Sequence, residues 1–193
     1  MLLLRIIITC GMQFSEEVIK IGEYARDEAM RTGWRGIFPD HLVLGMLRHG
    51  ANGATGILAS LGVSAEDMKA RLDMAMMAPE PVPYSELEEI GFSEDSASAF
   101  NLAAMEAMKK GRDRIEAVDL LVGVCRCSGS IAAAYLASHG ITASTLSSPE
   151  HGFLHDNPRS FTIPDPEETA AALEAQILSV LRIAGTENKK HFS

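Results

Sequence analysis

Residues 14–45 read FSEEVIKIGEYARDEAMRTGWRGIFPDHLVLG, and residues 92–123 read FSEDSASAFNLAAMEAMKKGRDRIEAVDLLVG. The two stretches align without a gap at a shift of 78 residues, and the alignment extends to residue 65 with eighteen identities over 52 positions. Gapless self-similarity over this length indicates a duplicated structural unit.

Each copy of the repeat carries helix signals. Ser15 precedes apolar residues at helical spacing, and Gly33 follows them, as expected for an N-cap and a C-cap. Further helix starts are expected at Pro39, at Ser64 and, in the second copy, at Ser93, Glu116, Ser130 and Thr142. Outside the first ten residues, the chain does not show the alternation typical of a strand. The sequence therefore predicts an all-α protein with two pseudo-symmetric four-helix repeats and a C-terminal helix.

Proline-rich stretches suggest where the repeats begin and end. Pro79, Pro81 and Pro83 exclude a regular helix between the copies. The last helix would place Leu173 and Ile177 on one apolar face, which needs either the repeats or another chain as a partner. The predicted organisation is a leader (1–11), a first repeat (12–77), a linker (78–91), a second repeat (92–147), an irregular tether (148–164), a C-terminal helix (165–185) and a tail (186–193).

Composition excludes several classes of protein. A formal net charge of −9 and a pI near 5.1 disfavour general nucleic-acid binding. The dense apolar run 2–10 is too short to span a membrane, and Arg5 at its centre is unlike a signal peptide. Three cysteines suit a reducing cytoplasm, and Cys125 and Cys127 lack a Cys/His pair at zinc spacing. We therefore expect a cytoplasmic protein without a metal or other cofactor.

The repeated motifs resemble the Clp N-terminal domain (Clp R domain), the duplicated helical module at the front of Clp unfoldase ATPases. The resemblance rests on Phe14-Ser15-Glu16, Gly33, Asp40-His41-Leu42 and Leu61-Gly62-Val63, with matching elements in the second copy. It implies a module of the Clp chaperone–protease system that binds substrates, adaptors or an unfoldase. The chain has no G-x-x-x-x-G-K-[ST] loop, so we expect a free-standing recognition domain without ATPase activity. No acid–base–nucleophile set is evident, so the chain is not expected to be an enzyme.

The same resemblance implies binding sites, because some family members bind phosphorylated arginine through their paired repeats. Carried over by position, the first site would be Ser15 and Asp40. A second would use Ser93, but Val118 replaces the acid, and Asp119 lies about 100° further around the helix. The alternatives are that Ser15 is only an N-cap and that Asp40 only favours a helix N-terminus.

Other residues and functions also remain open at this point. Trp34 is either a surface anchor for a partner or a half-buried structural residue. The alternative function is a structural self-association or scaffold protein with no link to proteolysis, a homo-oligomer formed through the C-terminal helix.

Overall fold

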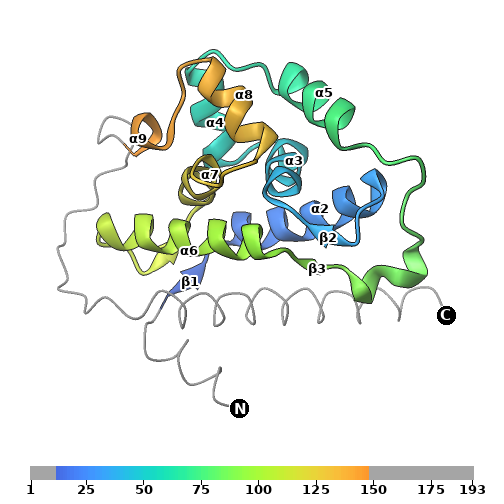
Figure 1. Cartoon of the computed structure of the whole chain (residues 1–193). Helices are drawn as coiled ribbons and strands as arrows, with labels where there is room; N and C mark the ends of the chain where they lie inside the picture. The colour runs from blue at the N-terminus through green and yellow to red at the C-terminus, as the bar shows by residue number, and fades with distance from the viewer. Residues whose placement is uncertain (1–11, 148–193) are drawn as a thin grey trace.

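The computed structural model describes residues 12–147, and this part of the chain is built mainly from α-helices. Figure 1 shows α2 and α6 in the lower part of the described fold, where α3 packs on α2 and α7 packs on α6, with α4 and α8 at the top. The predicted all-α class and four-helix repeats are confirmed, whereas the predicted leader, tether, C-terminal helix and tail lie outside the described residues. The helices are α2 (Glu16–Thr32), α3 (Pro39–His49), α4 (Gly53–Ser60), α5 (Ala65–Met76), α6 (Glu94–Lys109), α7 (Ala117–Cys125), α8 (Ile131–Ser138) and α9 (Ala143–Leu146).

Four two-residue strands join the repeats, contrary to the expectation that no strand follows the first ten residues. They are β1 (Gln13–Phe14), β2 (Gly36–Ile37), β3 (Gly91–Phe92) and β4 (Arg114–Ile115). Two residues are too few to show an alternating pattern, which explains why the sequence did not reveal them. β1 pairs in parallel with β4, and β2 with β3, so each strand pairs with the other repeat. Because Phe14 pairs with Ile115 and Ile37 with Phe92, the register obeys the 78-residue repeat.

The predicted helix caps are present at most of the expected positions. The hydroxyl of Ser15 accepts from the Val18 N–H at 3.3 Å, and that of Ser93 accepts from the Ser96 N–H at 3.2 Å. Ser64, Ser130 and Thr142 cap α5, α8 and α9 in the same way. Glu116 differs, because its own side chain makes no capping bond. Local capping chemistry therefore sets most helix starts in both repeats.

Glycines at equivalent positions allow the long helices to pack closely. A Cβ on Gly45 would lie 2.5 Å from the Ile21 carbonyl oxygen, and one on Gly123 would lie 2.1 Å from that of Ala99. Both oxygens belong to backbone that cannot rotate away. The α2–α3 and α6–α7 contacts therefore depend on the missing side chains.

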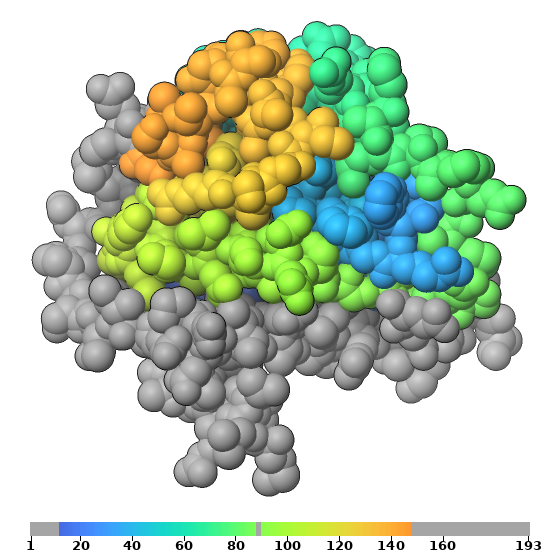
Figure 2. Space-filling view, viewed as in Figure 1, coloured from blue at the N-terminus to red at the C-terminus, as the bar shows by residue number. Residues whose placement is uncertain are grey.

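The segment between the repeats is packed against the first repeat. The Ala78 N–H donates to the Thr32 carbonyl at 2.8 Å, and the Val82 N–H donates to that of Met30 at 2.9 Å. A 3-10 helix, η1 (Tyr84–Glu89), follows the prolines and leads into β3. The space-filling view in Figure 2 shows the two repeats in close contact. No helix in residues 12–147 is both long and apolar enough to cross a membrane.

Candidate functional site

Asp40 connects the two repeats through hydrogen bonds. It lies in the first turn of α3, directly after Pro39, and only 6% of its surface is exposed. One of its carboxylate oxygens accepts from the Ser130 hydroxyl at 2.9 Å and from the Ala132 N–H at 2.7 Å. Asp40 of the first repeat therefore caps α8 of the second repeat.

A cavity of about 230 Å³ opens beside this cap, between the repeats. Two of its lining residues carry carboxylates, Asp40 and Asp95, and none is basic. Most of the other side chains that line the cavity are aromatic or apolar. The lining residues are Trp34, Phe38, Pro39, Asp40, Ala75, Met76, Asp95, Ser128, Gly129, Ser130 and Ile131.

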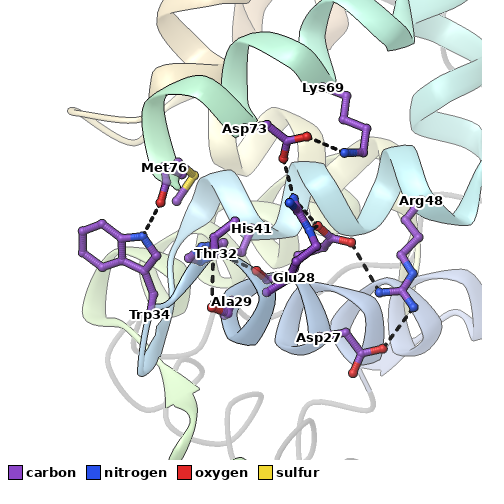
Figure 3. Close-up of polar contacts among 11 residues, drawn as sticks. Asp27, Glu28, Ala29, Thr32, Trp34, His41, Arg48, Lys69, Asp73 and Met76 are labelled. Carbon is purple, nitrogen blue, oxygen red and sulfur yellow. Dashed lines mark hydrogen bonds and ion pairs between the residues drawn. The ribbon is translucent and has the colours of Figure 1, made fainter. Parts of the chain in front are cut away.

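Trp34 forms one wall of the cavity and is held in place by two contacts. Its indole N–H donates to the Met76 carbonyl at 2.7 Å (Figure 3). Its ring meets that of Phe38 edge to face, with centroids 5.3 Å apart. The side chain is still 41% exposed. Both alternatives drawn from the sequence therefore describe it in part, because it is half-buried and also offers an exposed ring.

Ser15 lies next to a different turn from the one that carries Asp40. Its hydroxyl caps α2, and its backbone N–H donates to the Ile115 carbonyl at 3.0 Å. The described hydrogen bonds do not join Ser15 to Asp40. Because the strands pair between repeats, the equivalent bond on the Asp40 side comes from Ser93, whose N–H donates to the Ile37 carbonyl at 3.0 Å. The structure thus places the start of α6, including Asp95, beside Asp40.

The two residues of the predicted second site are also apart in the described contacts. Asp119 is fully buried and accepts from Lys110 Nζ at 3.1 Å and from Arg112 at 2.6 Å. Its other oxygen accepts from the Glu116 N–H at 3.0 Å, which completes the capping of α7 that Glu116 does not provide. Ser93 instead caps α6. The position equivalent to Asp40 is Val118, which faces Gly53 at the start of α4.

His41 caps the start of α3. Its Nδ1 accepts from the Phe38 N–H at 3.0 Å, and its Nε2 lies 3.0 Å from the Thr32 hydroxyl. Burial, with the positive charge of Arg31 adding to it, lowers the pKa of His41 to about 4. The ring is therefore neutral at physiological pH.

The two cysteines near the end of α7 are poor nucleophiles. Burial raises the pKa of Cys125 to about 12 and that of Cys127 to about 11, with neighbouring acidic groups adding to the shift. The thiols stay protonated at neutral pH, whereas the reactive form is the thiolate. Because α7 ends at Cys125, Cys127 lies just beyond the helix.

Asp95 and the Ser128–Ser130 turn were not anticipated as parts of the site. The sequence signal for Asp95 is weak, because an acidic residue in a first helical turn is common. Asp95 reaches the cavity because β2 of the first repeat pairs with β3 of the second. Strands of two residues leave no pattern in the sequence that would predict this pairing.

A model of the Clp repeat (R) N-terminal domain matches residues 13–139, which is more than half of the chain. The chain belongs to this family. It is 28% identical over 134 residues to the chloroplastic chaperone protein ClpC2 of Oryza sativa subsp. japonica, covering 69% of this chain and 14% of that protein. It is 25% identical over 130 residues to the negative regulator of genetic competence ClpC/MecB of Bacillus subtilis, covering 67% of this chain and 16% of that protein.

A solved Clp N-domain shares the fold. The N-terminal domain of the chaperone ClpD from Arabidopsis thaliana superimposes with a TM-score of 0.55 at 20% identity, covering 70% of this chain and 90% of that one. The match to the family model confirms the predicted family. This chain spans only about one seventh of the full-length Clp relatives quoted above, so the match concerns their N-terminal module.

Proposed function

We propose that this Clp N-domain protein is a non-enzymatic recognition module of the Clp chaperone–protease system that binds substrates or adaptors. The observation that carries the proposal is the acidic cavity between the repeats, lined by Asp40, Asp95 and Trp34. Family membership supports the protein-binding role, and the cavity supports recognition of a single side chain.

The size of the cavity favours a side chain over a larger ligand. Pockets for drug-sized ligands and cofactors usually measure about 300–1,000 Å³. An apolar cavity of roughly 150 Å³ can already hold a benzene ring. At about 230 Å³, this cavity suits one long side chain that enters from a bound protein.

The charge of the cavity favours a cation, and arginine fits best. Two carboxylates without a basic neighbour in the lining attract a positive group. A guanidinium can donate forked hydrogen bonds to a carboxylate, whereas a lysine ammonium is a compact point charge. Phosphorylated arginine, which the family resemblance implies, carries its phosphoryl group on a guanidinium nitrogen, so the two carboxylates favour the unmodified residue and the same test compares the two.

Calorimetry with short capped peptides that contain arginine or phosphoarginine tests this proposal. Ala75 is an exposed cavity-lining residue on α5, and Ala75→Lys adds a cation at the rim without touching the core. We expect it to weaken arginine-peptide binding about tenfold through like-charge repulsion. Ala70→Lys is the matched control, because Ala70 is also exposed on α5 but does not line the cavity.

A second variant tests Asp40 without removing the α8 cap. Asp40→Asn keeps an oxygen that can accept from Ser130 and Ala132 but loses the charge. We expect arginine binding to fall at least as much as in Ala75→Lys while the melting temperature changes little. Equal binding by the parent, Asp40→Asn and Ala75→Lys would contradict the proposal.

A further inference from the structure

We infer that the cavity and the exposed Trp34 that borders it read two residues of an extended peptide that are two positions apart: a basic side chain at Asp40 and Asp95, and a large apolar side chain on Trp34. This inference rests on the proposed function, because it describes a second contact at the same site. The partner is therefore a protein segment in which an arginine or lysine lies two positions from a residue such as leucine or phenylalanine.

The exposed indole is the main argument for the apolar contact. Trp34 is fixed by its bond to the Met76 carbonyl and by the Phe38 ring, yet 41% of it faces solvent. A side chain that is already ordered loses little conformational entropy on binding. Exposed, preorganised tryptophans are characteristic of the residues that dominate protein interfaces.

Other apolar side chains enlarge the surface around the indole. Met76 and Ile131 line the same cavity as Trp34. Methionine adapts its shape to different apolar partners, so this surface suits a segment of variable sequence.

Charge and spacing identify the occupant as a basic, extended segment. The aromatic wall and the two carboxylates border one cavity, so a single peptide reaches both. In an extended segment, side chains alternate between opposite faces, so residues two positions apart point to the same side and lie about 6.6 Å from each other. A net charge of −9 adds long-range attraction for a basic partner.

The other half of the molecule does not offer this combination. At the positions equivalent to Trp34 and Asp40, the second repeat carries Arg112 and Val118. Arg112 is bound to the buried carboxylate of Asp119. The inferred surface therefore occurs once in the duplicated fold, and we expect one peptide to bind per chain.

Two capped peptides that differ at one residue test the inference: Gly-Arg-Gly-Leu-Gly and Gly-Arg-Gly-Ser-Gly. We expect the leucine peptide to bind about tenfold tighter to the parent, because it buries an aliphatic side chain that serine lacks. Trp34→Ala should remove this preference and leave the weaker arginine contact. Tyr84→Ala, which removes another exposed ring outside the cavity lining, should keep the preference.

Fluorescence gives a second readout that does not depend on the stability of a variant. Trp34 is the single tryptophan of the chain, so emission from the unmodified protein reports on this wall alone. The leucine peptide should shift the emission to shorter wavelength more than the serine peptide does.

The outcomes separate the two proposals. Equal affinities for both peptides, or an unchanged emission with bound leucine peptide, would overturn the apolar contact while the arginine site stands. Failure of both peptides to bind the parent would overturn the proposed function together with this inference.

Discussion

The two repeats use different side chains to cap equivalent helices, α3 in the first repeat and α7 in the second. In the first repeat, neutral His41 caps the start of α3 and contacts the Thr32 hydroxyl at 3.0 Å. In the second repeat, the equivalent residues are Asp119 and Lys110, which cap the start of α7 and form an ion pair at 3.1 Å. Duplication therefore preserved the geometry of the turn while its electrostatics diverged.

The charged groups around these turns show what stayed fixed. Glu28 pairs with Arg48 at 3.3 Å, and the equivalent Glu106 pairs with Arg126 at 3.2 Å. Figure 3 shows the first of these pairs within a network that also reaches Asp73 on α5. The ion pairs that join the long helix to the next helix are thus common to both repeats, whereas the turn that leads to the cavity is not. The residues of the turn beside the cavity could therefore differ between the repeats, because the shared ion pairs hold the helices together in both.

The largest expected effect tests whether the α2–α3 and α6–α7 contacts depend equally on a glycine at the point of closest approach. Gly123→Ala should destabilise the fold by at least about 3 kcal/mol, since its Cβ would lie 2.1 Å from a backbone oxygen. Gly45→Ala should cost somewhat less, because the equivalent distance is 2.5 Å. Urea unfolding of both variants measures the difference.

Gly56→Ala supplies the control for these substitutions. Gly56 lies within α4, and a Cβ there would meet no atom within 4 Å. Alanine should therefore stabilise the helix, by up to about 1 kcal/mol. If Gly45→Ala and Gly123→Ala were as harmless as Gly56→Ala, the close approach of the long helices would be refuted.

The next effect sharpens the contrast between neutral His41 and charged Asp119. The pKa of His41 falls from 6.5 to about 4 on folding, so below pH 6.5 the unfolded chain binds a proton that the folded chain excludes. Stability from this residue is therefore full above pH 6.5 and falls as the pH drops towards 4. Between pH 7 and 5 the loss should be about 2 kcal/mol.

His41→Gln should abolish this part of the pH dependence. Glutamine at the third position of a helix can cap the same N–H without titrating. Unfolding free energies of the parent and the variant, measured from pH 7 to pH 5, should diverge in slope. His139→Gln removes an exposed histidine of the second repeat and should leave the parent slope unchanged. Parallel curves for the parent and His41→Gln would disprove a buried neutral imidazole.

The sequence predicted the helices well because their signals are local. Ser15 and Gly33 determine the ends of α2 through bonds to residues three to five positions away. The 78-residue repeat then extended the assignment to the second copy. Such signals do not reveal which repeat supplies the partner for a given strand.

The candidate site was only half predictable for that reason. Asp40 was predicted from the family resemblance, and it does line a cavity. Its neighbours Asp95 and Ser130 come from the other repeat, 55 and 90 residues away along the chain. Pairing of β2 with β3 brings the start of α6 to Asp40, and only the folded arrangement reveals this contact.

The smallest expected effect concerns the caps of the two equivalent short helices, α4 and α8. Asp40 caps α8 from the other repeat with two buried bonds, whereas Glu17 accepts one exposed bond from the Gly53 N–H at 3.2 Å within its own repeat. Asp40→Ala leaves the buried Ala132 N–H unpaired and should cost about 1.5 kcal/mol. Glu17→Ala should cost only a few tenths of a kcal/mol, because water can replace the carboxylate. Thermal unfolding compares the two variants, and equal losses would mean that the contact between repeats adds nothing beyond an ordinary surface cap.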